Sequence, residues 1–332
     1  MIFKCVNCGG NVVYSPEKKK MFCPYCDSED SQEIKYVKWG QLTVCPDCNG
    51  VIPVQEYTAA TRCPYCDNYI VLDERVEGEF LPKQIIPFQL GKETVKQSMR
   101  EKFKKKVFAP TDFLSEVRLE TMEGNYVPFW FFDYDVNADY QGEGRKVRSW
   151  TSGNTEYTET SYYDVRRNLD IHFRDIPVDA SIPMPDAVMD LMEPYDYKQL
   201  ADFDPKYLSG FVAERYNMPA ADLEKRARTK MGDDTKELMQ QQLTGYGSIK
   251  EIRNAAGVLR EEQNYGLLPV WKYLYRYKGQ DYPFYINGQT GKIVGEVPLS
   301  AAKVWAYAGT LWICLSIIFS TVLLVSLAFS LV

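Results

Sequence analysis

The sequence predicts an α+β protein made of three unlike parts. Two small tandem ribbons with four cysteines each come first, a pseudo-duplicated antiparallel β-sheet domain with helices follows, and one apolar helix comes last. Three observations support this prediction: eight of the nine cysteines lie in two evenly spaced sets, two Pro-x-Trp segments recur 141 residues apart, and no charged side chain follows Lys303. The predicted ranges are 1–40 and 41–72 for the ribbons, 73–84 for a linker, 85–300 for the sheet domain and 304–332 for the apolar helix.

The composition is that of a folded protein of two or three domains. The 332 residues are 45% hydrophobic and 14% aromatic, with a formal net charge of −6. This fraction of apolar residues is enough to bury a sizeable core, so disorder is expected only in short linkers.

The cysteines form two sets with identical spacing. Each set has two Cys-x2-Cys knuckles separated by fourteen residues, and the second set repeats the first after forty residues. The text Cys-Pro-Tyr-Cys-Asp also occurs in both sets, so we infer a tandem duplication of one small module. The predicted metal ligands are Cys5, Cys8, Cys23, Cys26, Cys45, Cys48, Cys63 and Cys66.

Four thiolates at this spacing are typical of a structural zinc site. A two-residue gap lets one turn place both sulfurs on the same ion, and the four sulfurs then close a tetrahedral shell at about 2.3 Å with no position for a substrate. Each ribbon has too little apolar sequence for its own core. We therefore expect two structural Zn²⁺ ions to fold the ribbons, each contributing on the order of 10 kcal/mol. Iron in a rubredoxin-like site is the alternative, and the red colour of ferric thiolate would reveal it.

Residues 304–332 predict one transmembrane helix. About twenty helical residues cross a hydrocarbon core of roughly 30 Å, and only a helix satisfies its own backbone there. Trp305, Tyr307 and Trp312 lie near the start of this stretch, where aromatic rings favour the headgroup layer. The alternative is a core helix of a soluble protein, although such helices rarely carry so long a charge-free run.

The first residues contain no apolar segment of the kind found in secretory signals. Lys292 and Lys303 precede the apolar stretch, in agreement with the positive-inside rule. We therefore expect a single-pass protein of the cell membrane whose N-terminal bulk lies in the cytoplasm. A cytosolic setting also argues against disulfides.

The middle of the sequence predicts strands around two related segments. Val127-Pro-Phe-Trp and Leu268-Pro-Val-Trp each lead into residues that alternate with period two, so we expect a strand to begin after each proline. Further strands are predicted around 155–173, 282–286 and 292–297, with Asn287-Gly288 as a hairpin turn.

Helices are predicted at 92–106, from Asp204-Pro205 to Tyr216, and over 219–243 with an interruption near Gly232. The stretch 248–263 weakly favours a strand. The helix at 92–106 is strongly basic. It is expected to be an ordinary packed helix with a solvated outer face, and the alternative is that it lies against anionic lipid.

The sequence offers little support for catalysis. His172 is the only histidine, and it lies in an alternating strand pattern without a catalytic motif. Ser-His-Asp and Cys-His nucleophilic arrangements are therefore not expected. The acidic pair Asp133 and Asp135 is expected to be solvated. We predict that the protein is not an enzyme and has no evident small-molecule substrate. A hydrolase that uses carboxylates alone is the alternative.

The two ribbons favour a protein partner over nucleic acid. Residues 1–72 hold seven Lys/Arg and eight Asp/Glu, a balance of −1 that two four-thiolate zinc sites would shift to about −5. Phosphate binding needs clustered cations, and only Lys18, Lys19 and Lys20 cluster here. Tyr25 and Tyr65 could stack on bases, but hydrophobic packing beneath the knuckles is expected. A membrane-tethered nucleic-acid-binding regulator remains the alternative function.

These features together resemble the bacterial membrane-anchored proteins with TFIIB-type zinc ribbons. The resemblance rests on the doubled ribbons, the lead-in at 85–88, the two Pro-x-Trp strands, the segment 284–298 and the terminal span. It implies an adaptor or scaffold that recruits a membrane-associated partner of the flotillin-like (SPFH) or phage-shock type in the response to envelope stress.

Overall fold

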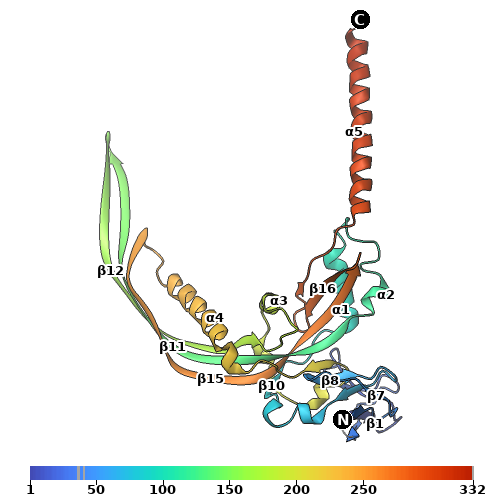
Figure 1. The fold of residues 1–332 in the computed structure, drawn as a ribbon. Helices are drawn as coiled ribbons and strands as arrows, with labels where there is room; N and C mark the ends of the chain where they lie inside the picture. Colours follow the sequence, from blue (N-terminus) through green and yellow to red (C-terminus); the bar gives the residue numbers. More distant parts are fainter. Residues whose placement is uncertain (36–37, 40–41, 331–332) are drawn as a thin grey trace.

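The computed structural model describes residues 1–35, 38–39 and 42–330. The cysteine ribbons lie at one end of the molecule, a long curved sheet with helices forms the body, and helix α5 leaves the opposite end as an isolated rod (Figure 1). The predicted α+β architecture, with two four-cysteine groups, a sheet domain with helices and a C-terminal apolar helix, is confirmed.

The helices and strands follow one another along the whole described chain. The helices are α1 (Lys92–Phe103), α2 (Glu116–Leu119), α3 (Asp186–Met192), α4 (Ala220–Gln241) and α5 (Ala301–Ser330), with 3₁₀ helices η1 (Asp73–Arg75), η2 (Gly78–Phe80), η3 (Tyr197–Gln199) and η4 (Pro205–Leu208). The strands are β1 (Ile2–Cys5), β2 (Val13–Ser15), β3 (Lys20–Phe22), β4 (Ser31–Ile34), β5 (Lys38–Trp39), β6 (Leu42–Val44), β7 (Val51–Ile52), β8 (Thr58–Arg62), β9 (Tyr69–Val71), β10 (Gln84–Ile85), β11 (Glu123–Ser152), β12 (Thr155–Asp179), β13 (Ala201–Asp202), β14 (Val212–Glu214), β15 (Ser248–Tyr277), β16 (Gln280–Asn287) and β17 (Ile293–Val294).

The sheet is mixed and not purely antiparallel as predicted. Its order is β13-β10-β15-β11-β14-β8-β9, with β12 paired to β11, and with β16 and β17 on the side of β15. The long pairs β11–β12 and β11–β15 are antiparallel, whereas the short strands β10 and β14 run parallel to β15 and β11. Sequence alternation marks strands but not their direction, so the two parallel pairings could not be read from it.

The two Pro-x-Trp segments are neighbours at the centre of the sheet. Val127 lies opposite Leu268, and Tyr126 lies opposite Pro269. Both prolines lie inside their long strands, so the prediction that a strand begins after each proline was wrong. A proline in a central strand has no N–H for the ladder, so each position needs a reason to be tolerated.

That reason is a change of partner strand. Beside β11 the partner is β14 up to Tyr126 and β12 from Phe129 onward, so Pro128 falls where the partners change. Its carbonyl accepts from the Ala180 N–H at 2.9 Å.

The second motif repeats this arrangement. Beside β15 the partner is β10 up to Leu267 and β16 from Val270 onward, and the Pro269 carbonyl accepts from the Gly288 N–H at 2.9 Å. The two halves of the sheet are therefore related in topology as well as in sequence.

The helix predictions met mixed outcomes. Helix α1 agrees with 92–106 but ends at Phe103. Helix α4 runs through Gly232 without the predicted interruption, because one glycine costs only about 1 kcal/mol and the helix packs on the sheet. The Asp204 side chain caps as predicted, accepting from the Lys206 N–H, but only one 3₁₀ turn forms and residues 212–214 become β14.

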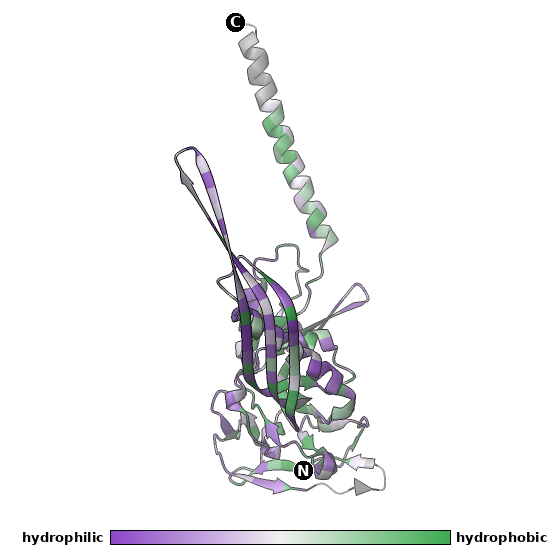
Figure 2. Cartoon of the chain, turned by 90° about the vertical axis from the view of Figure 1, so that its left-hand side faces the viewer, coloured by the Kyte–Doolittle hydropathy of each residue, from purple (hydrophilic) through white to green (hydrophobic). Residues whose placement is uncertain are grey.

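The core follows the inner part of the sheet. Phe88 stacks on Phe211 with ring centroids 4.1 Å apart and meets Tyr126 and Trp271 edge to face. Farther along the arm formed by β11, β12 and β15, helix α4 covers one face through Leu223, Met231 and their neighbours. The arm beyond α4 is largely polar and extends in the same general direction as α5 (Figures 1 and 2).

The stretch Ala301–Thr321 of α5 is long and apolar enough to cross a membrane, and none of it is buried against the rest of the chain. Figure 2 shows the helix standing clear of the body, with hydrophobic residues along much of its coloured length. An unburied apolar helix of this length does not fit the alternative of a soluble core helix, whose apolar face would be covered. Residues 331–332 of the predicted span, and the predicted ribbon boundary at 40/41, lie outside the described residues.

Candidate metal centres

The structure brings the eight predicted cysteines together in two groups. The four Sγ atoms of each group lie within 4.8 Å of one another. Four of the distances are 3.5 Å (Cys5–Cys26 and Cys8–Cys23), 3.6 Å (Cys45–Cys66) and 3.7 Å (Cys48–Cys63). A tetrahedral ion with metal–sulfur bonds of about 2.3 Å would hold its sulfurs about 3.8 Å apart. Each group can therefore hold one metal ion.

All four knuckles share one backbone design. In each, the first cysteine N–H donates to the carbonyl five residues later, at 2.7 to 2.9 Å, and its carbonyl accepts from the N–H four residues later, at 2.9 to 3.0 Å. The residue at that fourth position has a positive φ, which Gly, Asn and Asp tolerate best. These residues are Gly9, Asp27, Asn49 and Asp67, with φ of 73°, 60°, 59° and 61°. These four residues at a fixed position after each knuckle are a sequence signal for the turn, in addition to the cysteine spacing.

The turns also aim backbone donors at the sulfurs. The Cys8 N–H is the largest influence on the Cys5 thiol and lowers its pKa to about 6, while the Gly50 N–H lowers the pKa of Cys48. Burial, by contrast, raises the pKa of Cys45. Four thiolates repel one another, so a divalent cation at the centre is what allows all of them to ionise together.

The tyrosines of the Cys-Pro-Tyr-Cys turns lie outside the knuckles. Tyr25 and Tyr65 pack edgewise over Gly10 and Gly50, where an added Cβ would come within 2.6 and 2.4 Å of a ring carbon. The two rings are nevertheless 73% and 68% exposed. The prediction that these rings pack beneath the knuckles was wrong, because each ring lies against a glycine of the other knuckle and keeps most of its surface exposed.

Both ribbons are fixed to the sheet domain. Strand β8 of the second ribbon pairs with β14, and so belongs to the ten-stranded sheet. The first ribbon is held by backbone and hydroxyl contacts of Ser209, whose Oγ donates to the Val12 carbonyl at 2.6 Å. Residues 73–84, expected as a linker, contain η1, η2 and the buried side chain of Val76. The ribbons are thus presented in a fixed position at the end of the molecule away from α5 (Figure 1).

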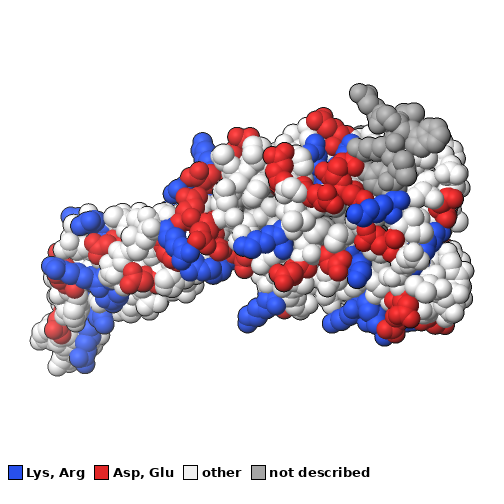
Figure 3. All heavy atoms as spheres, turned by 90° about the horizontal axis from the view of Figure 1, so that it is seen from below, with Lys and Arg blue, Asp and Glu red and all other residues white. Residues whose placement is uncertain are grey.

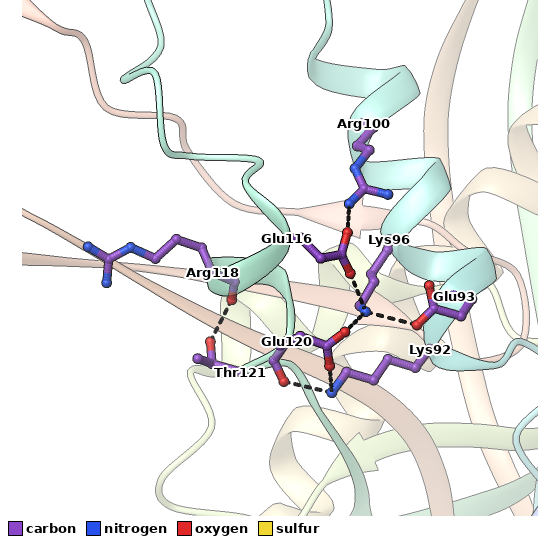
Figure 4. A network of polar contacts seen from close by, with 8 residues as sticks. All are labelled: Lys92, Glu93, Lys96, Arg100, Glu116, Arg118, Glu120 and Thr121. Atoms are coloured by element: carbon purple, nitrogen blue, oxygen red, sulfur yellow. Dashed lines mark hydrogen bonds and ion pairs between the residues drawn. The ribbon is translucent and has the colours of Figure 1, made fainter.

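A third group of ligand-type side chains is occupied by an ammonium. Glu93, Glu116 and Glu120 lie together, and the fully buried Lys96 places its Nζ among them, 2.8 Å from Glu93 and 2.7 Å from Glu116 (Figure 4). Burial lowers the pKa of Lys96, but hydrogen bonds with the three carboxylates outweigh it and raise the pKa above its ordinary value. The group therefore joins α1 to α2 and does not offer a metal site. Most cations of the basic helix are likewise engaged within the chain, which agrees with the packed-helix prediction.

Replacing Lys96 with Met is expected to lower the melting temperature by roughly 5 °C at pH 7, because three carboxylates lose their shared partner. Hydrogen bonds from Lys96 and then Lys92 lower the pKa of Glu120 to about 2 from 4.5. A lowered pKa stabilises the fold above pH 4.5 and loses that effect as the pH falls toward 2. The difference between the two proteins, measured by thermal unfolding in detergent, should therefore shrink below pH 4. Lys104→Met, at an exposed lysine, is the matched control and should change little.

His172 forms an exposed surface pair. Its Nδ1 lies 2.7 Å from Asp135 Oδ1, which also accepts from Arg174 at 2.8 Å. These hydrogen bonds, first that of His172, lower the pKa of Asp135. The adjacent hollow measures only about 50 Å³, enough for water but not for an organic substrate.

Comparison with known proteins gives one informative similarity. The chain is 31% identical over 314 residues to a protein of Bacillus subtilis (strain 168) described as "Uncharacterized protein YdjG", and the match covers 92% of each chain. No protein-family model matches the sequence. No solved structure matches it either.

Proposed function

We propose one function for the whole chain, because the chain belongs to the same family as YdjG of Bacillus subtilis and matches it over nearly the full length of both proteins. The protein acts as a membrane-anchored adaptor: α5 holds it in the cell membrane, the body faces the cytoplasm, and two structural zinc ribbons recruit a partner protein. The relative's description gives no activity that could be carried over.

One observation carries this proposal. The closed cysteine groups and the exposed, unburied apolar helix lie at opposite ends of one molecule (Figure 1). A closed four-thiolate shell has no position for a substrate, so its role is to hold a shape. The shape held here presents Tyr25 and Tyr65 to solvent, and exposed tyrosines are favoured at protein interfaces.

The ligands favour zinc as the metal. Four cysteines in a tetrahedral arrangement suit Zn²⁺ or an iron site, and the knuckle spacing is that of zinc ribbons. The eight cysteines would hold the ions and supply folding free energy. By the family resemblance, the partner is a membrane-associated protein of the flotillin-like (SPFH) or phage-shock type, and the setting is envelope stress.

The charges on the ribbons favour protein over nucleic acid as partner. Lys18 pairs with Asp27 at 3.6 Å and Lys20 pairs with Glu29, so the lysine cluster of the ribbons is largely neutralised. Seen from below, Lys and Arg are interspersed with Asp and Glu across the body of the molecule (Figure 3). Nucleic-acid binding would call for a continuous basic surface.

The test is capture of partners from a membrane extract by the detergent-solubilised full chain. Tyr25→Ala combined with Tyr65→Ala is expected to reduce the captured partner at least about tenfold, because buried interface tyrosines contribute strongly to binding. Tyr162→Ala is the matched control, since this tyrosine is 63% exposed but lies on the arm. Equal capture by all variants would remove the ribbon tips from the mechanism. Capture that disappears after nuclease treatment would favour the nucleic-acid alternative.

A further inference from the structure

The loop that follows α1 is attached to the foot of α5. The Ser300 N–H donates to the Phe108 carbonyl at 2.7 Å, and the rings of Phe108 and Tyr307 meet edge to face with centroids 5.5 Å apart. Residues 104–108, three lysines followed by Val107 and Phe108, are therefore held beside the first turns of the apolar helix. If α5 spans the membrane, this loop lies at the membrane surface.

A hollow of about 600 Å³ opens between this loop and the segment leading into α5. Its lining is mostly apolar, including Phe103, Phe108 and Leu299, and two lysines, Lys105 and Lys106, contribute to it together with one carboxylate, Glu296. This volume is within the range that small organic ligands occupy. Val107 and Leu299 are 65% and 70% exposed, so apolar surface continues from the hollow to the outside.

The two lysines of the hollow differ from the cations of α1. Lys92, Lys96 and Arg100 pair with carboxylates of the same chain. Within the described part of the chain, neither Lys105 nor Lys106 has such an ion pair, and both are exposed. Two free cations against one carboxylate leave the hollow positive, and that charge favours an anion from outside the chain.

We propose that this hollow binds one anionic phospholipid of the leaflet in which α5 begins. Lys105 and Lys106 bind the phosphate, and the exposed apolar surface of Val107 and Leu299 continues along α5 toward the acyl chains. The inference rests on the membrane anchoring proposed above. Each cation near an anionic membrane strengthens binding by roughly fivefold, so two of them produce a clear preference for anionic over zwitterionic lipid. Such a site would also fix the angle at which the body meets the membrane.

The experiment uses the full chain in detergent with equal amounts of phosphatidylglycerol and phosphatidylcholine, and native mass spectrometry counts the lipid retained. The wild type is expected to retain phosphatidylglycerol over phosphatidylcholine by about tenfold or more. Lys105→Gln with Lys106→Gln should remove that preference. Lys19→Gln with Lys35→Gln makes the same charge change on exposed lysines of the first ribbon, and should leave the preference intact.

The possible failures can be told apart. Equal retention of both lipids by the wild type, or an unchanged preference in the Lys105/Lys106 variant, would overturn the lipid site. If soluble glycerol phosphate displaces the lipid, the hollow is a site for a free phosphate ester and the phospholipid proposal is wrong. If a protein is captured at this surface instead, the hollow is a partner site and the proposal is also wrong. Flotation of the wild type and the variant with pure phosphatidylcholine vesicles tests the anchor separately, because α5 should hold both proteins there. A protein that does not float would refute the anchoring itself.

Discussion

Removing the metal from both cysteine groups with a strong chelator is expected to unfold the knuckles of residues 1–72 while the long strands β11 and β15 stay folded. Among the described residues, the first ribbon buries five apolar side chains besides its cysteines and the second buries six. The second ribbon, for example, has a small cluster around Ile52, Ile70 and Leu72. Metal binding should contribute on the order of 10 kcal/mol per site, more than such a cluster can replace. Strands β11 and β15 are paired over most of their length and need no metal.

Elemental analysis and amide hydrogen exchange together measure this effect. The wild type should hold two metal ions per chain, and Cys45→Ser with Cys48→Ser should hold one. The amide protons of Cys5, Cys23, Cys45 and Cys63, which are hydrogen bonded within the knuckles, should lose protection by several orders of magnitude after chelation. Cys314→Ser in α5 is the control and should keep both ions. Knuckles that remain protected without metal would contradict the structural role of the cysteine groups.

Replacing Arg226 with Met is expected to destabilise the protein by about 3 kcal/mol at pH 7, since it leaves a buried carboxylate without its partner. Arg226 of α4 donates at 2.7 Å to Asp179, whose side chain is fully buried at the end of β12, and also reaches Asp190 of α3. Among the described residues, the second oxygen of Asp179 has no hydrogen-bond partner. Together with Lys230 of the same helix, which contacts the Pro177 carbonyl and Asp190, this guanidinium joins α3, α4 and β12.

The loss of stability caused by Arg226→Met is expected to depend on pH. Burial, which exceeds the opposing effect of Arg226, raises the pKa of Asp179 to about 6 from 3.8. The folded state then binds this proton more tightly than the unfolded state, so the contribution of Asp179 to stability falls as the pH rises from about 4 through 6. The penalty of Arg226→Met should therefore be smaller at pH 5, where Asp179 is protonated.

Chemical unfolding in detergent at pH 5 and pH 7 checks this result. Asp179→Asn combined with Arg226→Met should recover part of the loss, because it removes the buried charge as well as its partner. Arg228→Met is the matched control on the same helix. Its guanidinium is 41% exposed and pairs with Glu224 and Glu261, so it should cost less than about 1 kcal/mol. A larger loss for Arg228 than for Arg226 would contradict the argument from burial.

Several features could be predicted from residue spacing because their causes are local. The Cys-x2-Cys knuckles, the apolar terminal helix, helix α1 and the hairpin turn at Asn287 each depend on residues close together in sequence. Asn287 illustrates this, since its side-chain oxygen accepts from the N–H groups of Gln289 and Thr290 within its own turn. The weak preference of 248–263 for a strand was also confirmed, as part of β15.

Other features depend on contacts between distant residues and could not be read in this way. Lys96 reads as one lysine among many on a basic helix, and only the approach of Glu116 and Glu120 from α2 turns it into a buried ion pair. Residues 212–214 read as the end of a helix, but pairing with Asn125 and Tyr126 of β11 makes them a strand.

The sequence by itself determined which residues can form metal sites, where an apolar helix can cross a membrane, and that two halves of the sheet are related. These properties follow from spacing, from hydropathy and from repetition along one chain. Tertiary structure alone decided that both Pro-x-Trp prolines lie in central strands, and that Lys105 and Lys106 line a hollow at the foot of α5. The physical reason is that distant parts of the chain decide both features. Neighbouring strands decide whether a proline is tolerated in a strand, and neighbouring loops decide whether a lysine has an ion-pair partner.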